Sequence, residues 1–167
     1  MGFKPGRSDL GGDTFSGWRR KIVSITAATY AVTRGQSGTI FTLNKADGIV
    51  VTLPAAEAGL EYEFYVETAL TSNNYTVNAA GTGDTLTGWL FSWDIADLGS
   101  TTLLNENVDT IGFSVPAAAD HQLVTNKTTT GGLKGSHWKY TCITDALWSV
   151  TGYNVGASGE TPATPFT

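Results

Sequence analysis

The clearest hydrophobic pattern in this chain is the alternation in residues 61–68. Tyr62, Phe64 and Val66 fall on one side of this run, and charged residues fall on the other side together with Tyr65. Alternation with a period of two is typical of a strand that buries one face. Short β-branched runs flank it on both sides, bounded by proline, glycine and asparagine. Residues 47–80 therefore predict three consecutive strands, over 49–53, 61–68 and 75–79.

Similar short runs recur along the chain and predict about ten or eleven strands, spaced as in sandwiches and barrels. We therefore predict an all-β fold with an antiparallel β-sandwich or jelly-roll-like body over residues 22–155. No fixed-length repeat is visible, which argues against a propeller or a solenoid. The predicted strands are residues 22–32, 39–43, 49–53, 61–68, 75–79, 85–93, 101–107, 108–115, 121–125, 133–143 and 147–153.

Both ends of the chain lack this periodicity. Residues 1–21 are rich in glycine and carry isolated apolar side chains, which predicts an extended N-terminal arm that becomes ordered on a partner. Residues 156–167 are rich in glycine, proline and threonine and predict a flexible C-terminal tail. We expect the apolar side chains of the arm to be its anchors: Phe3, Leu10, Phe15 and Trp18.

Composition supports one β domain. The chain has 167 residues, of which 41% are hydrophobic, so that a single core can form without staples. Only 15% of the residues are charged and 20 are glycine, a balance that favours strands and tight turns. The single cysteine, Cys142, lies in a predicted strand and is expected to be buried.

Charge is distributed unevenly between the arm and the body. Residues 1–21 contain five basic and two acidic residues, which gives a formal charge of +3. The net charge of the whole chain is −5, so residues 22–167 carry a formal charge of −8. We expect Arg19, Arg20 and Lys21 to contact an acidic protein surface. Nucleic acid is an unlikely partner, because five positive charges mixed with acids make a weak phosphate footprint and the acidic body repels it. Neither a signal peptide nor an apolar run of roughly 20 residues is present, so no membrane partner is expected.

Catalytic and metal-binding motifs are missing from the sequence. His121 and His137 are sixteen residues apart and have no zinc-site spacing. Acidic pairs such as Asp94 with Asp97 leave a structural ion or a polysaccharide-cleaving site open, but no motif supports either. We therefore predict no catalytic residue, no metal, no cofactor and no enzymatic activity.

Three aromatic residues alternate on one face of a predicted strand: Trp89, Phe91 and Trp93. Aromatic side chains dominate both protein cores and subunit interfaces, so a core or interface stripe is the favoured interpretation. A sugar-binding platform is the alternative.

Five segments together resemble small β proteins of tailed bacteriophages, which decorate or cement capsids or form head-fibre and tail-fibre modules. The likeness extends from residue 24 to residue 167. The segments are SITAATYAVT (24–33), GTIFTLN (38–44), GIVVTLPAAEAGLEYEFYV (48–66), NNYTVNAAGTGDTLTGW (73–89), and GSHWKYTCITDALWSVTGYN (135–154) with a terminal ATPFT.

The resemblance implies a homotrimer on the outer capsid surface that bridges neighbouring major capsid proteins. We therefore expect a structural virion protein, a capsid decoration or cement protein, that is assembled in the host cytoplasm. The absence of a repeat or a receptor-binding head departs from the long tail-fibre pattern. A carbohydrate-binding or host-adhesion module of a phage fibre is the alternative function.

Overall fold

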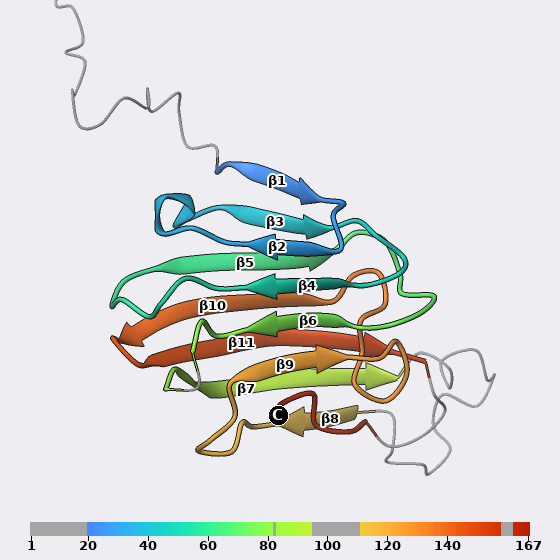
Figure 1. The fold of residues 1–167 in the computed structure, drawn as a ribbon. Helices are drawn as coiled ribbons and strands as arrows, with labels where there is room; N and C mark the ends of the chain where they lie inside the picture. The colour runs from blue at the N-terminus through green and yellow to red at the C-terminus, as the bar shows by residue number, and fades with distance from the viewer. Residues whose placement is uncertain (1–19, 82, 95–110, 158–161) are drawn as a thin grey trace, which may run out of the picture.

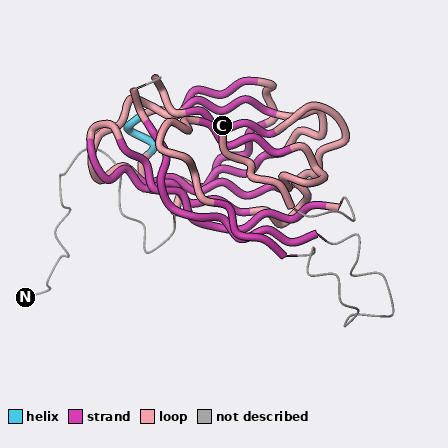
Figure 2. The backbone as a smooth tube through the Cα atoms, turned by 90° about the horizontal axis from the view of Figure 1, so that it is seen from below, coloured by secondary structure: helices cyan, strands magenta, loops and turns pink. Residues whose placement is uncertain are grey.

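The protein is built from two β-sheets that face each other (Figures 1 and 2). The structure is a computed structural model that describes residues 20–81, 83–94, 111–157 and 162–167. Within these residues it contains eleven strands and a single 3₁₀ turn, η1. The elements are β1 (Ile22–Ile25), β2 (Thr29–Ala31), η1 (Arg34–Gln36), β3 (Ile40–Leu43), β4 (Ile49–Thr52), β5 (Glu61–Val66), β6 (Tyr75–Asn78), β7 (Thr85–Asp94), β8 (Ile111–Ser114), β9 (Gln122–Thr125), β10 (His137–Thr144) and β11 (Leu147–Gly156). The prediction of an all-β fold is confirmed for this part of the chain.

One sheet has seven strands in the order β1-β3-β5-β10-β11-β7-β8, and the other has four in the order β2-β4-β6-β9. The first six strands alternate between the two sheets, so that the chain winds around both layers (Figure 1). As a result, β1, β3 and β5 are parallel neighbours in one sheet, and β2, β4 and β6 are parallel neighbours in the other.

The expected antiparallel pairing is therefore wrong for more than half of the sheet contacts. Five of the nine strand pairs are parallel, because β11 also runs parallel to β7. Antiparallel pairs are β5 with β10, β10 with β11, β6 with β9, and β7 with β8. Alternation determines which side chains are buried, but it does not determine which strand lies beside which.

The coiled path also explains why no repeat is visible in the sequence. Ile22 pairs with Ile40 and Ile40 pairs with Glu63, so that successive turns are offset by 18 and then 23 residues. The run 22–32, predicted as one strand, is divided between the two sheets as β1 and β2. Residues 26–28 carry the chain across, and the carbonyl of Ala28 accepts a hydrogen bond from Val50 at 2.9 Å.

Of the two strands predicted over 101–107 and 108–115, only the end of the second lies in the described part of the chain. Residues 95–110 lie outside the described part of the chain, so the expected pairing of 101–107 with 108–115 is untested. The described remainder forms β8, which pairs with β7, and Phe113 lies opposite Phe91.

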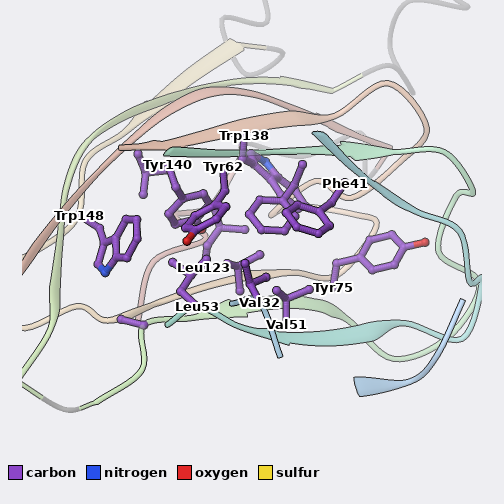
Figure 3. Packing of buried hydrophobic residues seen from close by; sticks show 14 of the residues in the cluster. Val32, Phe41, Val51, Leu53, Tyr62, Tyr75, Leu123, Trp138, Tyr140 and Trp148 are labelled. Atoms are coloured by element: carbon purple, nitrogen blue, oxygen red, sulfur yellow. The ribbon is translucent and has the colours of Figure 1, made fainter. Parts of the chain in front are cut away.

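The core lies between the sheets and is rich in aromatic residues (Figure 3). Phe41 stacks on Phe64 with ring centroids 5.3 Å apart, and Tyr62 packs against Trp148 at 5.8 Å. Cys142 is buried, as predicted. The seven-stranded sheet contributes six of the seven fully buried rings, and Tyr75 on β6 is contributed by the four-stranded sheet. The fully buried rings are Trp138, Trp148, Tyr62, Tyr75, Tyr140, Phe41 and Phe64.

A flexible tail was expected over residues 156–167; residues 158–161 lie outside the described part of the chain, and residues 162–167 pack against the body. Phe166 is buried and forms a bridge with Leu123 of β9. The backbone of Thr167 bonds to Gln122 in both directions, at 2.9 and 3.1 Å. These residues therefore cover the outer edge of β9, and Gly156 belongs to β11. One apolar ring and an exposed strand edge suffice to fix a segment whose composition predicts flexibility.

Gly88 is required where β7 approaches β11. Its φ of +109° is unfavourable for other residues, and an added Cβ would collide with the carbonyl oxygen of Val150 on the paired strand. Gly59 has a similar φ of +93°, but no atom lies within 4 Å of the position of its Cβ. A side chain at either glycine would strain the backbone, but only a side chain at Gly88 would also collide with a neighbouring strand.

We expect Gly88→Ala to lower the free energy of unfolding by about 2 kcal/mol more than Gly59→Ala does, because only Gly88→Ala forces the two strands apart. Urea unfolding monitored by circular dichroism measures both values. Equal destabilisation by the two substitutions would show that the close approach of β7 and β11 is not tight.

Candidate functional site: an aromatic ladder on the outer face of the seven-stranded sheet

The three aromatic residues singled out in the sequence lie on the outer face of β7. Trp89 and Trp93 are exposed and Phe91 is half-buried, whereas Leu90 and Ser92 between them are buried. The strand therefore turns these rings away from the core.

Neighbouring strands extend this stripe into a row across the sheet. Tyr65 on β5 lies opposite His137 on β10, His137 lies opposite Tyr153 on β11, and Tyr153 lies opposite Phe91. Phe91 in turn lies opposite Phe113 on β8. Because directly paired residues project from the same face of a sheet, all five rings share the outer face. We call this row, together with Trp89 and Trp93, the aromatic ladder.

The rings of the ladder form a continuous chain of contacts. Tyr65 and His137 stack with centroids 4.2 Å apart, and His137 is 5.6 Å from Tyr153. Contacts continue from Tyr153 to Trp93 at 5.9 Å, from Trp93 to Phe91 at 5.2 Å, and from Phe91 to Phe113 at 5.1 Å.

The ladder is most exposed near the edge of the sheet formed by β8. The exposed fractions of Phe113, Trp89, Trp93 and Tyr65 are 72%, 47%, 43% and 36%. Val115, directly after β8, is 66% exposed and extends the apolar surface. Scattered apolar residues are normal on a protein surface, but a contiguous aromatic surface of this kind marks a site of interaction.

The angles between the rings indicate whether the ladder fits a sugar or the side chains of another protein. Phe91 meets Trp93 at 88° and Phe113 at 68°, and Trp89 meets Phe113 at 59°. Rings packed edge to face do not form a coplanar platform on which the flat face of a sugar can stack. They form a ridged surface, which fits the side chains of another protein.

A cluster of charged residues borders the ladder at β5 and β10. Arg20 donates a hydrogen bond to the carboxylate of Glu63 and lies 3.9 Å from the carboxylate of Glu61. Lys139 pairs with Glu61 at 2.8 Å, and His137 Nε2 lies 3.5 Å from Glu63 Oε2. We call these five residues the ionic cluster. His137 belongs to both groups and joins the charged surface to the rings.

Burial and charge act in opposite directions on Glu63. Burial favours the neutral carboxyl and would raise its pKa, but the hydrogen bond and charge of Arg20, joined by His137, lower the pKa of Glu63 below 4.5. Burial also lowers the pKa of His137 below 6.5, although the negative charge of Glu63 acts to raise it. The imidazole is therefore neutral at pH 7, and Arg20 is the partner that keeps Glu63 ionised.

The predicted arm contacts are placed only in part. Phe3, Leu10, Phe15, Trp18 and Arg19 lie outside the described residues. Arg20, expected to contact an acidic protein surface, bonds within the chain to Glu63 and to the carbonyl of Gly38 at 2.9 Å, and its contact with a partner stays a prediction. Lys21 is exposed.

Sequence reasoning missed four members of the ladder: Tyr65, Phe113, His137 and Tyr153. They come from strands far apart in the chain, and only the pairing of β5, β10, β11, β7 and β8 brings them together. The sequence did contain one signal of an exposed ring, because Tyr65 falls on the charged side of the alternation in residues 61–68.

Across 20–81, 83–94, 111–157 and 162–167, no three His, Cys, Asp or Glu residues are grouped so that they could hold a metal ion. No helix in this part of the chain has the length and apolar character to cross a membrane. No protein family model and no curated protein sequence matches the chain.

We expect Arg20→Met to raise the pKa of Glu63, because the burial penalty remains while the donor and the positive charge are lost. An NMR titration of the Glu63 side-chain carboxyl carbon measures this pKa. Arg34→Met is the matched control, because Arg34 pairs with the exposed Glu57 at 3.1 Å. An unchanged Glu63 pKa in Arg20→Met would contradict the assigned role of Arg20.

The sign for stability follows from the lowered pKa. Glu63 stabilises the fold above its ordinary pKa of 4.5, and this contribution is lost as the pH falls through its lowered pKa in the folded state. In Arg20→Met the pKa of Glu63 in the folded state rises toward or above its unfolded value, so this loss of stability on acidification should become smaller than in the unchanged chain.

Proposed function

We propose that this chain is a structural virion protein of a tailed bacteriophage, a capsid decoration or cement protein. It binds the major capsid protein on the outer capsid surface as a homotrimer and stabilises the head, after assembly in the host cytoplasm. The observation that carries the proposal is the exposed aromatic ladder, a surface suited to burial in an assembly. The resemblance of residues 24–167 to small phage β proteins is the reason to propose a phage capsid as the assembly.

A rigid two-sheet body suits a protein whose task is mechanical. The aromatic core holds the sheets together, while the outer face of the larger sheet presents apolar rings that remain exposed in one chain. Each contact with a neighbour then adds buried surface without a change in the fold. Such a protein stabilises a shell by joining subunits that would otherwise separate.

The basic arm provides the second contact in the proposal. Residues 1–21 carry a formal charge of +3, and residues 22–167 carry −8. An acidic capsid surface attracts the arm and repels the body, which orients the protein on the particle. Three linked arms then bind with an avidity that a single arm does not reach.

A carbohydrate-binding or host-adhesion module of a phage fibre is the second candidate. The exposed indoles of Trp89 and Trp93 favour it. The steep angles between the rings weigh against it, because they leave no flat stacking surface. The decoration protein therefore remains the better-supported proposal.

The proposed function is tested by co-sedimentation of the full chain with capsids assembled from the major capsid protein of the same phage. We expect saturable binding, and at least about a tenfold loss of affinity when Phe3, Phe15 and Trp18 are replaced by serine, because each would remove a buried anchor. Replacing Ser8 and Ser16 by alanine is the control in the same segment and should leave binding unchanged.

Deletion of residues 1–17 should abolish capsid binding while the circular dichroism of the body is retained. Full capsid binding by the truncated chain would remove the arm from the mechanism. No binding of the intact chain to capsids, combined with binding on a glycan array that Trp89→Ala and Trp93→Ala abolish, would replace the proposed function by the adhesion module.

A further inference from the structure

We propose that the aromatic ladder is the surface through which copies of this chain bind one another. The inference deepens the proposed function, on which it rests, by assigning the subunit contact to one face of the body. The occupant of the ladder is a second copy of the chain, and the capsid is left to the arm.

The exposed area of the ladder matches the apolar centre of a stable interface. The exposed fractions of Phe113, Trp89, Trp93 and Tyr65 together amount to about two whole aromatic side chains, on the order of 400 Å². A standard interface buries about 800 Å² on each partner, of which somewhat more than half is apolar. The rings therefore supply nearly all the apolar area that one such interface needs.

The charge next to the ladder suits a copy of the same chain. In the ionic cluster, Arg20 and Lys139 offset Glu61 and Glu63, and His137 is neutral at pH 7, so its formal charge is zero. The whole chain carries a net charge of −5, so that two copies repel each other overall. A neutral region lets like-charged bodies approach without placing equal charges opposite each other.

A basic or acidic foreign partner has less to recognise here. The charged groups of the cluster already bond to one another, and Glu63 in particular is buried beside Arg20. Breaking these pairs to bind a charged surface would leave a buried carboxylate without its partner, which is costly. A partner that presents apolar rings and no net charge is favoured instead, and the ladder of a second copy has this chemistry.

Ring geometry agrees with self-association. The ladder offers both ring edges and ring faces, because its members meet at angles of 59° to 88° around Phe113 and Phe91. Edges and faces attract each other in aromatic pairs. Ladders of copies related by a threefold axis can set the ring edges of one copy against the ring faces of the next, and Phe113, at the edge of the sheet and the most exposed ring of the ladder, is positioned to insert first.

Sedimentation equilibrium of the full chain in the absence of capsids tests the inference. We expect a self-associating protein, with a trimer as its largest abundant species, and at least about a 30-fold weaker association for the double variant Phe113→Thr, Trp93→Thr, because both rings would be interface anchors. Threonine preserves strand propensity, so the monomer should keep its fold, which circular dichroism verifies.

The matched control is Val50→Thr, which changes an exposed apolar residue on β4 of the opposite sheet. Association of this control should equal that of the unchanged chain. A chain that stays monomeric at 100 µM (about 1.8 mg/ml at 17.6 kDa) would overturn the inference. Equal association of the ladder variant and the unchanged chain would also overturn it.

The failures of the two proposals are distinguishable. A monomer that still binds capsids leaves the proposed decoration function in place and removes the subunit contact. A ladder-dependent oligomer that does not bind capsids keeps the self-association surface and removes the decoration function. A ladder-dependent dimer supports the surface and contradicts the trimer.

Discussion

The fold depends on removing the inner aromatic face of the seven-stranded sheet from water. Phe41, Phe64, Tyr62 and Trp148 make a continuous layer there, and the four-stranded sheet is the surface that covers it. Because one sheet has seven strands and the other four, the C-terminal residues contribute additional cover, with Phe166 inserted beside Leu123. Burial of this layer determines which face of β3, β5 and β11 is turned inward, and so it also determines what these strands project from the opposite face.

That opposite face has an unusual distribution of side chains. A solvated sheet face is normally polar, yet here a row of rings crosses five neighbouring strands and ends at the exposed Phe113. At the other end, Tyr65 and His137 stack beside a set of paired charges. The same register that aligns the core therefore builds an outer surface with an apolar part and a neutral ionic part, which links the fold to the proposed assembly role.

The sequence predicted the local features well and the long-range ones poorly. Alternation around Tyr62 and Phe64 identified their strand and its buried side, and the aromatic stripe at Trp89 and Trp93 was visible within one strand, although the sequence did not decide whether it faced the core or the outside. Pairing was not predictable, because parallel strands that wind between two sheets leave the same alternation as a hairpin does. For that reason the contacts of Tyr65 with His137 and of Phe91 with Phe113 were missed. The docking of Phe166 was missed because composition reports the average tendency of a segment, whereas one ring in a matching site determines its position.

The central claim is that the aromatic ladder is exposed in one chain and buried in the assembly. Hydroxyl-radical footprinting with mass spectrometry measures this directly at Trp93 and Phe113, at protein concentrations from nanomolar to tens of micromolar. Labelling of both rings should fall as the concentration rises, while Val50 on the other sheet stays equally labelled and the buried Trp138 stays protected throughout. Constant, high labelling of Trp93 and Phe113 at every concentration and on capsids would contradict the claim.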